Sequence, residues 1–303
     1  SGSCSVRLRE EENGLALKRG KQTYLFQHPA AIQSFAAIGS KREGEGPLGE
    51  FFDTIDPDST FGQKSWERAE SRLHHDTVEL AVKKAGLSYA DLDCLLAGDL
   101  LNQCIGATFG VRELGIPYLG IYGACSNMAE GLLLSAFLAE SGLRYLGVST
   151  ASHFCTAERQ YRFPLEYGGQ RTPTSQWTVT GGGAVVVAGA AAQTPDQAGP
   201  WIQAAAIGTI EDKGIKDAAN MGAAMAPAAA ATILGFLSDT GTTPENYDLI
   251  LTGDLGQVGS DLLYELATRE GVDLRSRHTD CGLLIYDRDR QDVHEIGRAS
   301  CRE

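Results

Sequence analysis

The chain has 303 residues, of which 43% are hydrophobic and 21% are charged, a composition typical of a folded protein with a substantial core. Its formal charge is -13 and its basic residues form no stripe, so we expect no nucleic-acid partner. It contains neither a run of about 18 apolar residues nor a secretory leader, so we predict no membrane span and no signal peptide. Seven scattered cysteines without metal-site spacing predict free thiols in a reducing cytoplasm and no metal site.

The two ends of the chain do not read as parts of a domain. Residues 1–19 are polar and do not start with Met, so we expect a flexible extension. Residues 295–303 (EIGRASCRE) resemble a translated sequencing adapter, so we expect a non-native tail in place of the natural C-terminus. The alternative is an ordinary polar tail.

Between the ends, short apolar runs alternate with longer segments of helical periodicity. This alternation predicts an α/β fold of βαβ units around a mostly parallel sheet. Strands are predicted at 22–26, 31–38, 94–97, 118–122, 145–149, 183–188, 202–207, 249–252 and 283–286. Helices are predicted at 65–85, 103–114, 127–141, 218–237 and 258–269.

Two similar octapeptides indicate an internal duplication. DCLLAGDL at 93–100 and DLILTGDL at 248–255 each lie between a long and a shorter helical segment. The shared order of flanking elements predicts two similar βαβ halves. We place the N-terminal half at 20–192 and a truncated C-terminal half at 193–294, with their junction in the linker-like segment 189–199.

Cys125 is the strongest candidate for chemistry. It follows a predicted buried strand and directly precedes a predicted helix, within YLGIYGACSNMAEG at 118–131. A helix N-terminus favours the thiolate, as at a nucleophile elbow, although a small buried residue at a tight turn is an equally weighted alternative. A nucleophile needs a base, and His153 is the candidate, with a hydrogen-bonded, half-buried imidazole as its alternative. His74 lies in a predicted helix and His278 in a polar loop, so neither is favoured as a base.

Three further segments are unusual. Residues 157–177 are aromatic and cationic, with too much Gly and Pro for a single element, and predict an ordered excursion over a pocket. Residues 208–226 contain many small side chains and predict a helix packed closely on the sheet. The glycine-rich segment 39–49 matches no phosphate-binding spacing, so we interpret it as a tight, exposed cationic loop.

The two-half layout, the GACS elbow at 123–126 and the GGGAVV strand at 181–186 resemble the thiolase and ketoacyl synthase III superfamily. Longer and rarer strings resemble the stage V sporulation protein AD (SpoVAD) family of spore-forming bacteria. These strings are GKQTY at 20–24, EGEGPLG at 43–49, SHFCTAERQ at 152–160, FPLEYGGQR at 163–171, QWTVTG at 176–181, GIKD at 214–217 and NMGAAMAP at 220–227.

The resemblance implies a thiolase-like αβαβα sandwich. It also implies a noncatalytic protein of the spore SpoVA apparatus that binds dipicolinic acid, or its calcium chelate, for uptake during sporulation and release during germination. We expect a peripheral location at the spore inner membrane beside other SpoVA proteins, and a homodimer is compatible with the superfamily. We expect no cofactor, and whether calcium accompanies the ligand stays open.

The sequence departs from the catalytic members of the superfamily. Where a condensing enzyme places a catalytic His after a second-half strand, this chain has LTGDLG at 251–256, and a carboxylate does not stabilise an oxyanion. We therefore favour binding over the alternative, an acyltransferase or condensing enzyme with Cys125 as nucleophile and His153 as base. A third interpretation is a scaffold with a vestigial cleft.

A dipicolinate site needs partners for two carboxylates and an apolar slot for the ring. The sequence offers a set of cationic and polar candidates, each of which taken singly is more simply a solvated residue. They are Lys41, Arg159, Arg171 and Lys216, with Cys125, Ser126, His153 and Asn220. Asp99 and Asp254, on equivalent turns of the two halves, would repel a free dianion at the cleft unless a metal or a proton intervenes.

Overall fold

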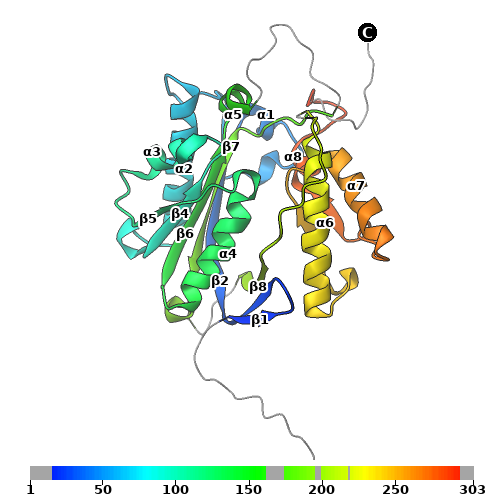
Figure 1. The fold of residues 1–303 in the computed structure, drawn as a ribbon. Helices are drawn as coiled ribbons and strands as arrows, with labels where there is room; N and C mark the ends of the chain where they lie inside the picture. The colour runs from blue at the N-terminus through cyan, green and yellow to red at the C-terminus, as the bar shows by residue number, and fades with distance from the viewer. Residues whose placement is uncertain (1–15, 162–173, 195–198, 218, 294–303) are drawn as a thin grey trace, which may run out of the picture.

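The computed structural model describes residues 16–161, 174–194, 199–217 and 219–293, and it confirms the α/β class (Figure 1). An eight-stranded sheet has the order β1-β2-β7-β6-β4-β5, with β3 and β8 also paired to β2, and a second sheet pairs β9 with β10. The strands are β1 Leu17–Arg19, β2 Thr23–Ser40, β3 Thr54–Asp56, β4 Cys94–Gly98, β5 Tyr118–Gly120, β6 Tyr145–Ser152, β7 Gly181–Ala188, β8 Trp201–Ala206, β9 Ile250–Thr252 and β10 His278–Asp280. The helices are α1 Lys41–Gly44, α2 Trp66–Lys84, α3 Ile105–Val111, α4 Asn127–Glu140, α5 Phe154–Tyr161, α6 Met221–Thr240, α7 Gly256–Arg269 and α8 Cys281–Ile285.

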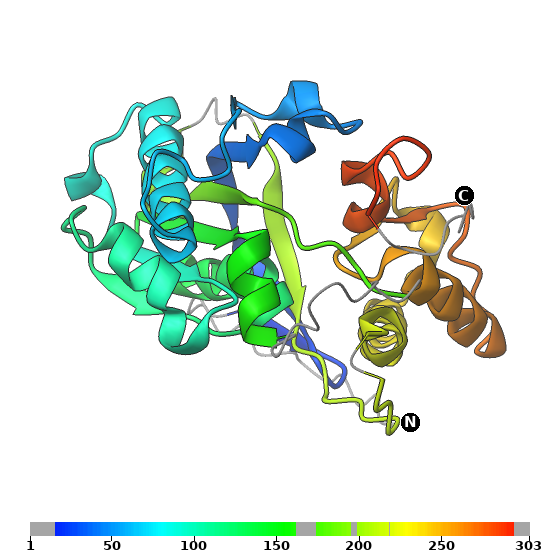
Figure 2. The same cartoon turned by 90° about the horizontal axis from the view of Figure 1, so that it is seen from above.

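Helices cover both faces of the large sheet, because its central strands are apolar on both sides. On β4, Leu95 packs with residues of α2 and α3, whereas its neighbour Leu96 packs in a cluster with residues of α4. Val186 and Val187 divide in the same way on β7. Successive side chains of a strand point to opposite faces, so these runs place one core on each side of the sheet. Figure 2 shows the layers from above.

Strand β2 spans both of the strands predicted at 22–26 and 31–38. Its ladder with β8 pairs Leu25 with Ala204 and resumes only at Ala30, so the pairing is interrupted around His28 and Pro29. There the Glu140 carboxylate accepts hydrogen bonds from the backbone N–H groups of Gln27 and His28 at 3.0 and 3.1 Å. A side chain from α4 thus replaces the missing ladder partners, and the strand continues through a sequence that resembles a turn.

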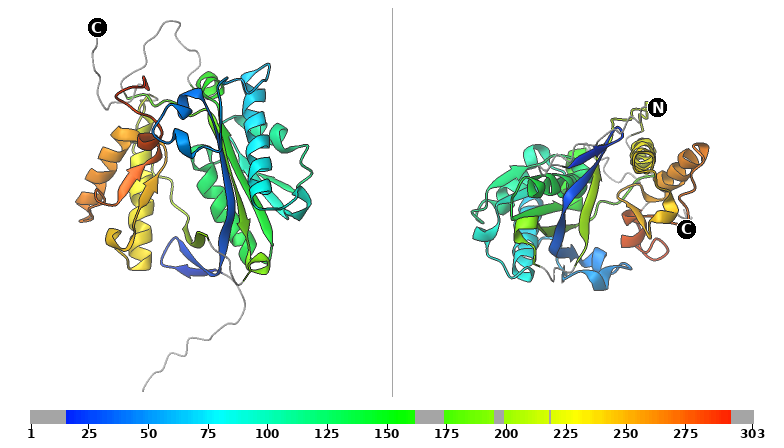
Figure 3. Two further views of the ribbon diagram at one scale, coloured as in Figure 1. Left: turned by 180° about the vertical axis from the view of Figure 1, so that it is seen from behind. Right: turned by 90° about the horizontal axis from the view of Figure 1, so that it is seen from below.

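The second half repeats the element order of the first. Helix α2, the 3-10 turn Tyr89–Asp91, β4, α3 and β5 are matched by α6, the 3-10 turn Pro244–Asn246, β9, α7 and β10. Both 3-10 turns carry a capping box, and both strand pairs are parallel. Figures 1 and 3 show α6, α7 and α8 together on the side of the large sheet away from α2 and α3. The duplicated octapeptides therefore lie in equivalent structural contexts.

The strand predicted at 283–286 is wrong, because those residues belong largely to α8 and the strand is β10, just before it. Asp280 decides this boundary: its side chain accepts a hydrogen bond from the Gly282 N–H and caps α8. His278, expected in a polar loop, is a buried residue of β10. The helix predicted from 103 begins later, since Gln103 and Cys104 both have positive φ, 62° and 52°.

The excursion expected at 157–177 begins in the helix α5. Residues 162–173 lie outside the described residues, and the segment 174–180, which leads into β7, is neither helix nor strand. Among the described residues, one helix is long and apolar enough to cross a membrane by length and composition, namely α6, with a mean hydropathy of 1.5. The sequence prediction had not singled it out. One face of α6 packs in the core of the second half, so its length and apolar composition are only weak evidence that it spans a membrane.

Candidate functional site

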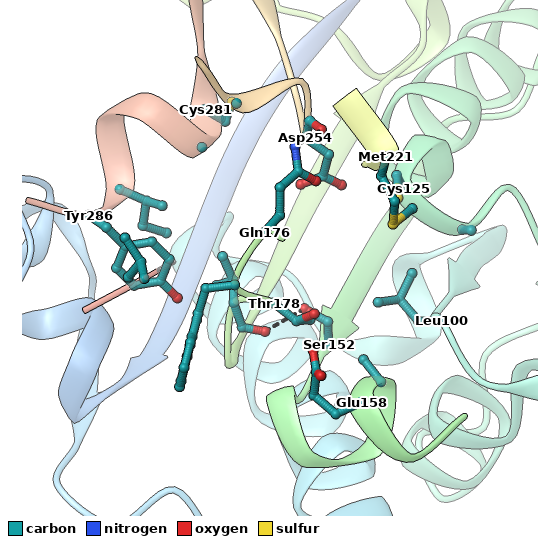
Figure 4. Close-up of a pocket in the computed structure, with 18 of the residues that line it drawn as sticks. Leu100, Cys125, Ser152, Glu158, Gln176, Thr178, Met221, Asp254, Cys281 and Tyr286 are labelled. Carbon is teal, nitrogen blue, oxygen red and sulfur yellow. Dashed lines mark hydrogen bonds between the residues drawn. The ribbon is translucent and has the colours of Figure 1, made fainter. Parts of the chain in front are cut away.

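A pocket of about 290 Å³ lies where α5 and the segment before β7 meet the second half (Figure 4). Its walls come from β6, α5 and the segment before β7 on one side, and from α8 and the first residues of α6 and α7 on the other. The lining residues are Leu100, Ala124, Cys125, Thr150, Ala151, Ser152, Ala157, Glu158, Gln176, Trp177, Thr178, Val179, Met221, Asp254, Gly256, Cys281, Gly282, Ile285, Tyr286 and Val293.

Cys125 reaches this pocket from a strained turn, the 3-10 segment between β5 and α4. Ala124 has φ 49°, a left-handed conformation that a residue with a Cβ rarely adopts. The Asn127 side chain holds the turn, because it accepts a hydrogen bond from the Gly123 N–H at 2.7 Å and donates one to the Asp99 carbonyl at 3.0 Å. The strain presents Cys125 at the N-terminus of α4, as the sequence predicted.

Asp254 faces Cys125 from the turn that follows β9. It too has a left-handed backbone, with φ 61°. The Gln176 side chain, from the segment before β7, donates to the Asp254 carbonyl at 2.7 Å. The next two N–H groups, of Leu255 and Gly256, donate to the carboxylate of Asp280 at 3.2 and 2.9 Å. The conformation of Asp254 is thus fixed from both halves of the molecule.

Asp280 anchors both turns of the second half that border the pocket. Besides the turn at Asp254, it holds α8 through the Gly282 N–H at 3.0 Å and accepts from the Thr252 hydroxyl at 2.6 Å. Cys281, which follows β10 as Cys125 follows β5, consequently opens onto the same pocket. One fully buried carboxylate therefore positions Asp254 and Cys281 together.

The electrostatics of the pair are opposite to those expected of an activated cysteine. Cys125 and Asp254 both keep exposed surface at the pocket wall, so their side chains are only partly surrounded by protein. This partial burial, followed by the charge and hydrogen bonding of Asp254, raises the pKa of Cys125 well above its ordinary value. Burial also raises the pKa of Asp254, and the nearby Asp280 adds to this. The helix N-terminus does not overcome these effects, so the thiol stays protonated near neutral pH.

Aromatic residues close the other end of the pocket. Trp177 stacks on Phe154 with 3.9 Å between ring centroids, and the Arg42 guanidinium lies 4.0 Å from the Trp177 ring centre. Tyr286 donates a hydrogen bond of 2.5 Å to the buried carboxylate of Glu43. Because Glu43 is in the first half and Tyr286 in the second, this bond ties the two pocket walls together.

His153, the predicted base, is not among the lining residues. Its ring is buried, lies 5.0 Å from that of Trp66, and has both nitrogens occupied. Nε2 donates to the Ser59 carbonyl at 2.8 Å, and Nδ1 accepts from the Cys155 N–H at 3.1 Å. Burial lowers the pKa of His153. The structure therefore places His153 in a hydrogen-bonded, buried setting, which is the alternative to a catalytic base, and does not bring it to Cys125.

Two further candidates bond to the backbone at the starts of helices, and of these only Asn220 caps its helix with its side chain. The Ser126 hydroxyl donates to the Gly123 carbonyl at 2.9 Å, and the Asn220 side chain accepts from the Ala223 N–H at 3.1 Å, at the start of α6. Neither residue lines the pocket, although each adjoins one that does, Cys125 and Met221 respectively.

The three cationic candidates that the structure describes do not line the pocket either. Lys41 lies 3.9 Å from a glutamate carboxylate one helical turn away, and Arg159 pairs with Glu67 at 2.5 Å. Lys216 is exposed in the segment before α6. Arg171 lies outside the described residues. None of the three described cations is a lining residue.

Of the two aspartates expected at the cleft, Asp254 lines the pocket and Asp99 does not. Asp99 is buried and accepts from the N–H groups of Leu101 and Ala107 at 2.7 and 2.6 Å. Sequence reasoning assigned no individual role to five of the lining residues, although strings of the family resemblance contain the first three of them. They are Gln176, Trp177, Glu158, Cys281 and Tyr286.

The pocket holds no ready-made metal site among the described residues. In that part of the chain, the one group of three potential ligands is His75, Asp76 and Glu79 on the outer side of α2. Asp76 already pairs with Arg72 at 2.7 Å. None of these three residues lines the pocket.

Comparison with solved structures shows the fold. The chain matches OleA of Xanthomonas campestris with a TM-score of 0.55 at 15% identity, covering 85% of each chain. It matches 3-oxoacyl-[acyl-carrier-protein] synthase III of Aquifex aeolicus with a TM-score of 0.51 at 15% identity, covering 83% of each chain. These similarities confirm the thiolase-like fold predicted from the sequence.

Comparison of sequences shows the family. A model of the stage V sporulation protein AD family matches residues 20–302. The stage V sporulation protein AD of Bacillus subtilis (strain 168) is 45% identical over 273 residues, which cover 90% of this chain and 79% of that protein. This chain therefore belongs to the stage V sporulation protein AD family, and its role lies in sporulation.

Proposed function

We propose that the chain is a noncatalytic binding protein for dipicolinic acid, free or as its calcium chelate, and that the pocket between its halves is the binding site. In this proposal the protein acts in the SpoVA apparatus at the spore inner membrane, in dipicolinate uptake during sporulation and release during germination. Membership of the family supports the role in sporulation. The ligand and the location are inferences that go beyond family membership.

The observation that carries the proposal is the pairing of Cys125 with Asp254. Acyl transfer through a cysteine requires a thiolate, a base and donors for an oxyanion. Here the group next to the sulfur is a carboxylate, which repels both a thiolate and an oxyanion, and His153 is engaged elsewhere. The cavity persists without an activated nucleophile, which favours ligand binding.

The size and lining of the pocket suit a small aromatic acid. A volume of about 290 Å³ is at the lower end for ligand pockets, which begin at roughly 300 Å³. Leu100, Ala151, Val179 and Ile285 supply apolar surface, and a few hydroxyl, amide and carboxyl groups stand among them. This combination is typical of sites that hold a flat ring and orient it by a few polar contacts.

Isothermal titration of dipicolinic acid, with and without calcium, tests the proposal. We expect saturable binding by the native sequence, loss of binding in Cys125→Phe, whose ring would occupy the pocket, and unchanged binding in Ser126→Ala, which alters the next residue on the same turn. Circular dichroism checks that each variant is folded. The absence of saturable binding under all of these conditions would refute the proposal.

The alternative is a cysteine-dependent acyltransferase, and one observation favours it: Cys125 stands on a strained turn at a helix N-terminus, in a fold shared with 3-oxoacyl synthases. Incubation with an acyl-CoA followed by mass spectrometry distinguishes the two. Stoichiometric acylation of Cys125 without dipicolinate binding would make the protein an enzyme.

A further inference from the structure

We propose that the pocket takes up its dianionic ligand together with a proton, and that Asp254 carries this proton. The inference rests on the proposed function, because it concerns the charge state in which the same pocket accepts a dicarboxylate. It assigns Asp254 the role of a ligand-binding acid that must be neutral when the site is filled.

The charge of the pocket wall is the first reason. Among the lining residues that the structure describes, Asp254 and Glu158 are the charged ones, and neither Lys, Arg nor His is present. A dicarboxylate that enters this space brings two negative charges beside the carboxylate of Asp254. Holding like charges close together is unfavourable unless one of them is neutralised.

The groups packed around Asp254 make it the residue best placed to take the proton. Cys125 faces it from the turn before α4, and Cys281 approaches from α8. Asp280 lies behind it on β10 and adds a further negative charge. Two described arginines of neighbouring segments have other partners: Arg42 lies over the Trp177 ring, and Arg288 donates to the Gln257 side chain at 2.9 Å.

The surroundings of Asp254 are therefore neutral or acidic, and burial is the main cause that raises its pKa in the empty pocket. A ligand carboxylate nearby would raise this pKa further. The protonated acid would then donate a hydrogen bond to the ligand, since a carboxyl group turns from acceptor to donor when it binds a proton.

The structure favours a proton over a metal ion as the compensating charge. A calcium site built by the protein would gather several oxygen ligands, whereas the described pocket residues bring together no three ligand atoms of the His, Cys, Asp or Glu kind. The Asp254 carboxylate moreover shares a hydrogen bond with the Cys125 thiol, which is a poor ligand for calcium.

Calorimetry in two buffers measures the number of protons that the protein takes up when the ligand binds. Dipicolinate is titrated into the protein with a chelator present, at each of several pH values between 6 and 8.5, in phosphate and in Tris, whose heats of ionisation differ. For the native sequence we expect uptake of about one proton per ligand where Asp254 is ionised in the empty pocket. We also expect the affinity to fall about tenfold per pH unit in that range.

Two matched variants assign the proton. Asp254→Asn keeps the size of the side chain and removes its charge, so we expect proton uptake to disappear and the affinity at pH 8 to become at least tenfold higher and independent of pH. Asp248→Asn neutralises an exposed aspartate of the same half that does not line the pocket, and we expect it to leave proton uptake in place.

The outcomes separate this inference from the proposed function. Absence of dipicolinate binding at every pH, with or without calcium, would refute the proposed function itself. Binding without proton uptake, or uptake that survives in Asp254→Asn, would overturn the inference alone. Binding that requires calcium and does not vary with pH would also overturn it, because a metal would then supply the compensating charge.

Discussion

Replacing Glu70 by glutamine should make the protein more stable at neutral pH. Glu70 lies on α2 and is fully buried. One of its oxygens accepts a hydrogen bond of 2.5 Å from the Thr156 hydroxyl, and the other has no partner. Burial raises the pKa of Glu70 to about 8, and the nearby charges of Asp99 and Glu67 contribute to the increase.

The magnitude follows from the difference between the folded and unfolded states. An unfolded glutamate titrates near 4.5, so between pH 4.5 and 8 the folded protein holds a proton that the unfolded chain has lost. Stability therefore decreases as the pH rises through this window, by about 1.4 kcal/mol per pH unit. At pH 7 the loss is about 3 kcal/mol. Glu70→Gln imitates the protonated acid at every pH, so it should recover this amount at pH 7 and nothing at pH 4.

His74, one helical turn further along α2, acts in the opposite direction. It is fully buried, and burial lowers its pKa to about 3 from 6.5. The unfolded chain binds a proton there below pH 6.5 and the folded protein does not, so stability decreases as the pH falls from 6.5 to 3. The effects of Glu70 and His74 cancel between pH 4.5 and 6.5. The native sequence should therefore be most stable in that window. In Glu70→Gln only the effect of His74 remains, so stability should rise with pH up to about 6.5 and stay level above it.

Urea unfolding at pH values from 4 to 8, followed by circular dichroism, measures these differences. Glu79→Gln is the matched control, because Glu79 is an exposed carboxylate on the same helix and should change stability little. The reasoning is refuted if Glu70→Gln is less stable than the native sequence at pH 7, or if its effect does not depend on pH.

Three further predictions concern the pocket and the contacts between the halves. Asp254→Asn removes a negative charge beside the thiol, so alkylation of Cys125 by iodoacetamide at pH 8, followed by mass spectrometry, should become about tenfold faster; an unchanged rate would contradict the pairing. Gly222→Ala would place a Cβ 2.6 Å from a backbone oxygen just before α7 and should cost about 1–3 kcal/mol in urea unfolding. Tyr286→Phe deprives the buried Glu43 of a donor and should cost about 1–3 kcal/mol; an unaltered unfolding midpoint would argue against this bond.

Sequence patterns predicted the elements whose apolar residues recur regularly. Helix α2 begins after Ser65, whose side chain accepts a hydrogen bond from the Arg68 N–H, and its buried residues follow helical spacing. The fully buried strand Cys94–Gly98 appeared as an unbroken apolar run. These features are local, so a single sequence is enough to find them. Short elements such as β10 and α8 contain too few residues to show a hydrophobic period. The boundary between these two elements is set by the side chain of Asp280, which caps α8.

The candidate site, too, could be predicted only in part from the sequence. The sequence by itself determined the α/β class, the turn that presents Cys125 and, through long and rare strings, the family resemblance. Only the tertiary structure decided what surrounds that cysteine: Asp254 from the other half, Gln176 that holds it, and a histidine turned toward Ser59 instead. The physical reason is that a local pattern fixes which face of an element is buried, whereas the partner of that face depends on how distant elements pack.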